Sequence, residues 1–264
     1  MKTPNTPLGY IGLIVLVASL YSCANYNLYT PRYDQRLGDK MKREIENAPL
    51  TYPLLAEAEH QRIYDYVNGI VDTLLNTGLL RYKNDFAWEV KLIDDAEVLN
   101  AFVTPGGYIY VYTGLIQYLD SEDQLAGVLA HEIAHADLRH ASRQMTQKNS
   151  LSTVLLVTGG VAGTDLLTDI GASLVSLKFS RGFEKEADRM AIRILCATNY
   201  QADGLAGFFE KLESNGNGRL PAFLSTHPNP GKRVEKIKKS AADLNCQGTT
   251  TNRRTYQRMK RWLP

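Results

Sequence analysis

Apolar side chains recur along the chain in two rhythms, one helical and one extended. Over residues 57–75 they return every three or four positions, which predicts a helix with one buried face. Residues 86–93 alternate apolar and polar side chains and predict a strand. Residues 100–103 and 108–112 flank a Pro-Gly-Gly turn, so they predict a hairpin. We therefore expect a helix followed by a small sheet.

Helical spacing returns after the hairpin. Residues 113–119 predict a short helix, and Asp120 or Ser121 then caps a longer helix. This longer helix has Glu122 and Asp123 in its first turn, where negative charge is favourable. This longer helix also carries the first residues in the chain that indicate a catalytic or metal-binding site.

Residues 150–179 are apolar and rich in glycine, unlike the rest of the chain. Asp165 and Asp169 interrupt the stretch, so neither half reaches the roughly 20 apolar residues that a membrane-spanning helix needs. We predict two short helices around residues 163–165. A buried hairpin is the favoured arrangement, and a mobile flap at a membrane face is the alternative.

A His-Glu-x-x-His motif lies in the longer helix. His131 and His135 are four residues apart, so both imidazoles project from one face and suit two ligand positions of a tetrahedral Zn²⁺. Glu132 can reach a water at that metal and take its proton. A solvated polar stripe is disfavoured because the flanking residues are apolar. His140 lies about 140° round the helix from His135, so we expect it at the surface.

A second helix, from about residue 181 to 195, offers carboxylates. Glu184 and Asp188 share one of its faces, being four residues apart. One carboxylate from this helix would complete a His₂Glu zinc site with an open fourth position, the arrangement of catalytic sites. Spacing alone does not choose between Glu184 and Glu186. Asp188 would then accept the free N–H of a ligand histidine.

Composition bounds the class of protein. With 264 residues and 44% hydrophobic content, the chain is long enough for one sizeable domain. Its formal net charge of +2 gives no nucleic-acid signature. Besides Cys23 there are two cysteines, Cys196 and Cys246, which form either one disulfide or two unpaired thiols.

The N-terminus resembles a bacterial lipoprotein signal. Lys2 precedes an apolar stretch over residues 8–20, which is short for a spanning helix. The following Leu-Tyr-Ser-Cys resembles a lipobox and makes Cys23 the lipidated residue, whereas the alternative is an ordinary signal peptide or an uncleaved anchor. The resemblance implies a lipid anchor on the periplasmic face of the bacterial envelope, with the outer membrane favoured because no aspartate follows Cys23.

Several motifs together resemble the zinc metallopeptidase family of CAAX prenyl proteases, HtpX-like proteases and BepA-like periplasmic proteases. The resemblance covers residues 54–239 and implies a gluzincin-type α+β fold, mostly helical, with a small β-sheet packed on the helix of the His-Glu-x-x-His motif. It also implies that Glu184 is the third zinc ligand. Its motifs are residues 131–135, 180–188, 100–107, 114–116 and 226–228.

The same resemblance places His227 near the metal. There it would either stabilise an oxyanion or cover the zinc, although its proline-flanked loop also fits a histidine that caps the next helix. Arg233 would lie behind the metal ligands, together with Asp188. A peptide substrate would bind extended along residues 108–112 through main-chain hydrogen bonds. The residues that would contact it are Asn100, Tyr108, Ile109 and Tyr110.

We therefore divide the chain into four segments. Residues 1–22 form a signal peptide, 23–53 a polar tether with a short helix, 54–245 the metalloprotease domain, and 246–264 a basic tail. Disorder is the favoured state of the tail, and contact with anionic lipid or a partner is the alternative.

The sequence thus predicts a lipid-anchored zinc endopeptidase that holds one Zn²⁺ and cleaves unfolded or misassembled envelope polypeptides. The alternative is a chaperone-like envelope assembly factor whose protease activity is latent or dispensable.

Overall fold

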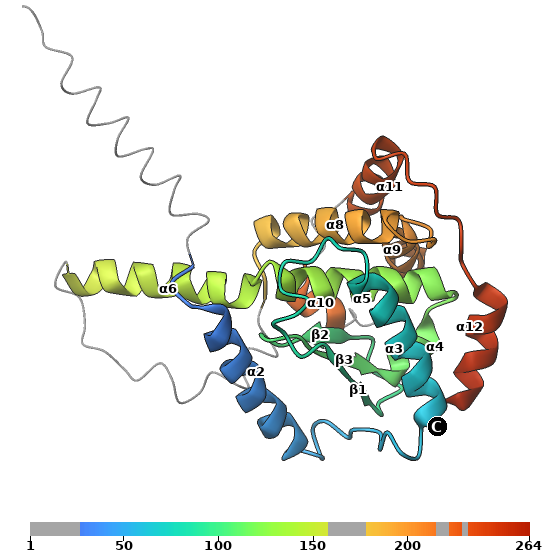
Figure 1. Ribbon diagram of the computed structural model, residues 1–264, viewed down its shortest axis with the longest axis horizontal. Helices are drawn as coiled ribbons and strands as arrows, with labels where there is room; N and C mark the ends of the chain where they lie inside the picture. The colour runs from blue at the N-terminus through green and yellow to red at the C-terminus, as the bar shows by residue number, and fades with distance from the viewer. Residues whose placement is uncertain (1–26, 158–177, 215–221, 229–231) are drawn as a thin grey trace, which may run out of the picture.

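The computed structural model describes residues 27–157, 178–214, 222–228 and 232–264. Helix α5 (Glu122–Asp137) runs through the middle of the molecule, and every one of its residues is buried. It packs against two helices, α8 and α9, on one side and against strand β2 on the other (Figure 1). The predicted architecture, mostly helical with a small sheet beside the motif helix, is confirmed.

The sheet has three strands, β1 (Glu89–Ile93), β2 (Ala101–Val103) and β3 (Tyr108–Tyr112), in the order β1-β3-β2. Strand β3 pairs in parallel with β1 and antiparallel with β2, so the predicted hairpin is confirmed. The turn between β2 and β3 contains Gly107, whose φ of 90° favours glycine.

The prediction that substrate lies along residues 108–112 is wrong. Strand β3 is central in the sheet, and both its neighbours already take its main-chain hydrogen bonds. The sequence predicts the hairpin, but it does not predict the order of the strands in the sheet. A substrate strand can be added only at an edge.

The remaining helices surround α5 and the sheet. Figure 1 shows α8, α9 and α11 on the side of α5 opposite the sheet, and α6 extending away from the body of the molecule. Their bounds are α2 (Pro31–Glu46), α3 (Gln61–Leu75), α4 (Thr113–Tyr118), α6 (His140–Val157), α8 (Arg181–Cys196), α9 (Gly204–Ser214), α10 (Ala222–Thr226), α11 (Arg233–Asp243) and α12 (Arg253–Met259), followed by a 3₁₀ turn, η1 (Lys260–Trp262).

Helix α2 corrects the prediction of a polar tether with only a short helix. It has 16 residues, and it buries Leu37 and Met41 among other apolar side chains. At Gly38 an added Cβ would lie 2.0 Å from the carbonyl oxygen of Pro105, so the glycine permits close approach to the hairpin turn. The first part of the described chain therefore docks onto the hairpin and the rest of the domain.

The C-terminal segment is also folded, whereas its composition favours a disordered tail. Tyr256 and Met259 on α12 are fully buried, and the Tyr256 hydroxyl donates to the carbonyl of Ile116. Basic side chains predominate in the sequence of this segment, but the burial of Tyr256 and Met259 holds it against the rest of the domain. The disulfide between Cys196 and Cys246 is formed and ties this segment to the end of α8.

Three predicted features lie outside the described residues: the signal peptide, Cys23, and the glycine-rich part of residues 150–179, of which 158–177 are not described. Within the described part of the chain, no helix is long and apolar enough to cross a membrane.

Candidate metal centre

Three elements bring the candidate ligands together. His131 and His135 project from α5, and Glu184 lies in the first turn of α8, where the Ser180 hydroxyl caps the helix. His227 directly follows α10. Helices α5 and α8 approach closely where Ala187 is fully buried, because a small side chain leaves room for the neighbouring helix.

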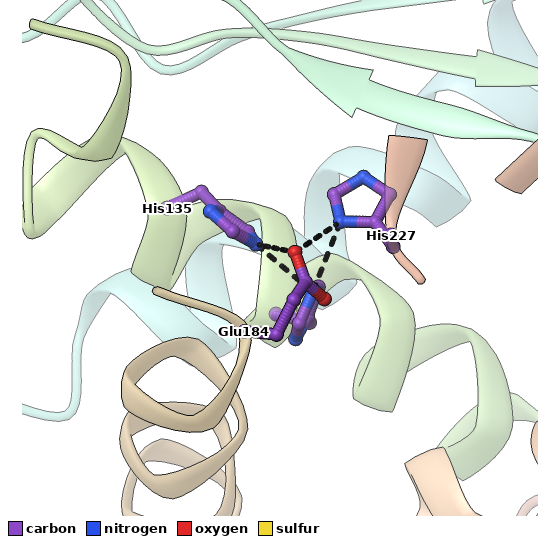
Figure 2. Close-up of side chains that lie close together, drawn as sticks. His135, Glu184 and His227 are labelled. Atoms are coloured by element: carbon purple, nitrogen blue, oxygen red, sulfur yellow. Dashed lines mark hydrogen bonds and ion pairs between the residues drawn. The ribbon is translucent and has the colours of Figure 1, made fainter. Parts of the chain in front are cut away.

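The donor atoms of these four residues converge. His131 Nε2 lies 3.0 Å from His135 Nε2 and 3.3 Å from His227 Nδ1. Glu184 Oε1 lies 3.4 Å from His135 Nε2 and 3.2 Å from His227 Nδ1. Figure 2 shows His135 and His227 reaching the Glu184 carboxylate from opposite sides.

These spacings fit a metal. Zinc–nitrogen bonds of about 2.0–2.1 Å in a tetrahedron place neighbouring ligand atoms roughly 3.3 Å apart. Two bare imidazole nitrogens 3.0 Å apart also repel each other unless a proton or a cation lies between them. The donor set, three imidazoles and one carboxylate, is one that zinc accepts.

The burial of the four candidate ligands increases their need for a nearby cation. His131, His135, Glu184 and His227 are each at most 2% exposed. Burial lowers the pKa of His131, but hydrogen bonds with Asp188 and Glu184 outweigh it and raise the pKa to about 9. Burial holds the pKa of His135 well below its ordinary value. The Arg233 guanidinium, 3.2 Å from Glu184 Oε2, supplies one positive charge beside the cluster. A metal bound by these residues would supply more, in exchange for protons on its ligands.

Glu132 faces the same site from α5. Its Oε1 lies 3.4 Å from His227 Nε2 and has no hydrogen bond in the described part of the chain. Burial raises the pKa of this carboxyl. An unsatisfied carboxylate beside a metal position is suited to accept a proton from a reacting water.

Asp188 and Arg233 lie behind His131. Asp188 Oδ1 is 3.1 Å from His131 Nδ1, the ring nitrogen that faces away from the other candidate ligands. Arg233 donates to both Asp188 oxygens, at 2.6 and 2.8 Å, and its guanidinium lies over the Phe209 ring. This two-point contact fixes the carboxylate that in turn orients His131.

His140 is not at the surface, which corrects our prediction. It is fully buried, and its Nδ1 lies 2.8 Å from His135 Nδ1. The prediction assumed one continuous helix, but α5 ends at Asp137 and Arg139 adopts a left-handed φ of 57°. The chain turns there, so α6 starts with His140 directed back at His135. Neither glycine nor proline marks this break in the sequence.

The predicted substrate residues lie at different depths. Asn100 immediately precedes β2, is 7% exposed, and its side-chain oxygen has no hydrogen bond among the described residues. Tyr108, Ile109 and Tyr110 lie on β3, behind β2 as seen from α5. A cavity of about 10 Å³ is lined by residues that include Val103, at the end of β2, and His135 of the cluster.

Comparison with known proteins places this site in a family. Residues 64–241 match the model of peptidase family M48. The chain is 30% identical over 238 residues to the beta-barrel assembly-enhancing protease of Yersinia pestis, covering 83% of this chain and 46% of that protein. It is 30% identical over 229 residues to the Escherichia coli K12 protein of the same name, covering 80% and 44%.

A mitochondrial relative is also similar. The metalloendopeptidase OMA1 of Arabidopsis thaliana is 34% identical over 151 residues, which cover 57% of this chain and 31% of that protein. The chain thus spans about half, or less, of the length of these relatives. The resemblance seen in the sequence motifs is confirmed: this chain belongs to peptidase family M48.

Proposed function

We propose that this protein is a zinc endopeptidase in which His131, His135 and Glu184 hold one Zn²⁺. The observation that carries the proposal is the spacing of their donor atoms, which matches the edges of a tetrahedral zinc site. When bound, zinc supplies Lewis-acid polarisation of a carbonyl and makes a water acidic enough to react near neutral pH.

Glu132 is the general base in this proposal. It accepts a proton from the water that attacks the peptide carbonyl, and it returns that proton to the leaving amine as the C–N bond breaks. Its burial beside the ligands, with one carboxylate oxygen that has no hydrogen bond among the described residues, supports this role. Asp188 and Arg233 keep His131 in the orientation that the metal requires.

His227 keeps the resting enzyme inactive. Its Nδ1 occupies the fourth position of the cluster, and its Nε2 faces Glu132. An imidazole held there takes the place that the reacting water needs, and substrate cleavage requires it to move away. In the competing role, His227 donates a hydrogen bond to the oxyanion that forms during cleavage. Loss of His227 would then lower the cleavage rate, whereas loss of a blocking imidazole would raise it.

The peptide substrate binds at the edge of β2. In the antiparallel pairing, Thr104 N–H and the Asn100 carbonyl bond to β3, so the intervening Ala101 and Val103 direct their main-chain groups to the other edge. That edge lies beside α5. An extended peptide that adds there lies next to the metal and is held mainly through its backbone, which tolerates many side chains.

The leader and the relatives support a proposed biological setting in the bacterial envelope. Lipidation at Cys23 would anchor the enzyme on the periplasmic face of the bacterial envelope, preferably at the outer membrane. Its substrates are unfolded or misassembled envelope polypeptides. Two relatives carry the name beta-barrel assembly-enhancing protease, which supports this setting and also the alternative of an assembly factor with dispensable proteolysis.

The substitution Glu132→Gln tests the proposal and separates the two functions. The purified variant should retain about one zinc per chain and should not cleave an unfolded protein such as casein. In cells it should behave like a deletion if proteolysis is the function. A variant that restores the deletion strain without cleaving would establish the assembly role instead. Peptides trapped on the inactive variant would identify the substrates.

A further inference from the structure

We propose that His140 and Glu186 form a hydrogen-bonded relay that fixes the tautomer and orientation of His135. They are positioning residues, because they touch His135 and each other rather than the metal or the substrate. The inference rests on the proposed metal site and extends it by one layer of residues, on α6 and α8, that lies outside the candidate ligands.

The two ring nitrogens of His135 face different groups. Its Nε2 lies 3.0 Å from His131 Nε2 and 3.4 Å from Glu184 Oε1, so it faces the metal position. Its Nδ1 faces away from that position and lies 2.8 Å from His140 Nδ1. Both rings are buried, so water does not compete for this contact.

The positions of the protons follow from these contacts. Because His135 Nε2 must offer a lone pair to the metal, the neutral ring carries its proton on Nδ1. That N–H donates to His140 Nδ1, which must therefore be unprotonated. The single proton of the His140 ring then lies on Nε2, which is 3.4 Å from Glu186 Oε2. Each donor thus meets an acceptor, from His135 to His140 to Glu186.

The outer end of the relay is held in place. Arg143 donates to Glu186 Oε2 at 2.7 Å, and its guanidinium lies 4.8 Å from the centre of the Phe183 ring. Phe183 in turn stacks on His140, with ring centres 4.6 Å apart and planes inclined by 24°. These contacts join α6 to α8, so the orientation of His140 depends on the packing of two helices.

The two ligand histidines are therefore oriented by different means. His131 meets a carboxylate directly, at Asp188, whereas a second imidazole stands between His135 and its carboxylate. Without His140, the Nδ1–H of His135 loses a buried acceptor and the other tautomer becomes competitive. That tautomer puts a proton on Nε2, where the metal should bind. Removing the relay should thus weaken metal binding.

Zinc affinity of the full chain, measured with Zn²⁺ against a chromogenic chelator, tests this account. His140→Ala should weaken binding by about 10- to 100-fold, the usual cost of losing an outer hydrogen-bond partner. Glu186→Gln should weaken it less, because the glutamine oxygen still accepts from His140. The double variant should bind no more weakly than His140→Ala, since the relay is already broken.

Matched controls are Glu210→Gln, which removes an exposed ion pair with Lys238, and His60→Ala, which removes a histidine distant in sequence. Both should leave zinc affinity unchanged. Thermal unfolding of the metal-free proteins reports any purely structural effect of His140→Ala. Wild-type affinity in that variant, or independent effects that multiply in the double variant, would overturn the relay. A wild-type protein that binds no zinc would instead overturn the proposed metal site.

Nitrogen-15 NMR of the histidines in the zinc-loaded wild-type protein tests the relay without any substitution. We expect His140 protonated on Nε2 only and His135 protonated on Nδ1 only. A proton on His140 Nδ1 would place two donors face to face and would overturn the proposal, even if a variant failed to fold.

Discussion

Helix α5 carries two buried glutamates that differ in how their oxygens are satisfied. Glu122 stands at the start of the helix, and Glu132 ten residues later; they are 6% and 1% exposed. Glu122 accepts hydrogen bonds from the hydroxyls of Tyr66 and Tyr200 and from the amide of Asn252. These donors come from three separate segments, so Glu122 joins them to the helix.

Glu132 has the opposite surroundings. One of its oxygens has no hydrogen bond in the described part of the chain, and its neighbours are histidines and a second carboxylate, Glu184. Burial alone therefore does not distinguish a functional carboxylate from a structural one. A fully satisfied carboxylate stabilises the fold, whereas an unsatisfied one beside clustered imidazoles is available for a metal, a water or a substrate.

The largest expected difference concerns activity. Glu132→Gln should lower the cleavage rate by about 10²–10⁴-fold, the usual contribution of a general base, with zinc content and melting temperature unchanged. Peptidase assays with zinc analysis and thermal unfolding on the same samples measure all three. Substantial cleavage by this variant would mean that another group accepts the proton.

Metal binding should separate Glu184 from other glutamates. Glu184→Gln removes a candidate ligand, so it should weaken zinc binding by more than the roughly 100-fold limit expected for an outer partner. Glu210→Gln, which removes an exposed ion pair with Lys238, is the control. Equal zinc affinities for the two variants would remove Glu184 from the ligand set.

The free energy of unfolding should change most when Glu122, at the start of α5, is substituted. Glu122→Ala leaves the buried hydroxyl of Tyr200 without its acceptor, and it also removes the part-buried contacts with Tyr66 and Asn252. A buried unsatisfied polar group costs about 1–3 kcal/mol, so denaturant unfolding should show a loss of at least this order. The zinc content of the folded protein should not change. A loss of zinc with unchanged stability would reverse the roles that we assign to Glu122 and Glu132.

His227→Ala tests whether the fourth position is blocked. Basal cleavage of an unfolded substrate should rise if the imidazole excludes water from the site. It should instead fall by about 10²–10³-fold, at unchanged zinc content, if the histidine stabilises an oxyanion. A change within about twofold, under half a kcal/mol, would dismiss both roles.

The spacing of residues within single elements allowed much of this site to be predicted. His131 and His135 follow helical geometry, and family resemblance selected Glu184 over Glu186, which the structure places outside the cluster against His140 and Arg143. These inferences needed only the period of a helix and a known motif.

The features that were missed depend on how elements meet. A left-handed Arg139 breaks the helix and buries His140, but no residue type in the sequence marks that turn. The order of the strands makes β3 central, although a hairpin alone leaves either strand free to be the edge. The docking of α12 rests on two apolar residues, Tyr256 and Met259, within a basic segment. Tertiary packing decided each of these outcomes.

X-ray absorption at the zinc edge of the purified wild-type protein tests the central claim most directly. The account predicts about one zinc per chain, with only nitrogen and oxygen ligands at about 2.0–2.1 Å and with scattering from three imidazoles. His227→Ala should retain the zinc with two imidazoles, from His131 and His135. A protein without zinc, or with zinc bound by fewer than two imidazoles, would contradict the metal centre proposed here.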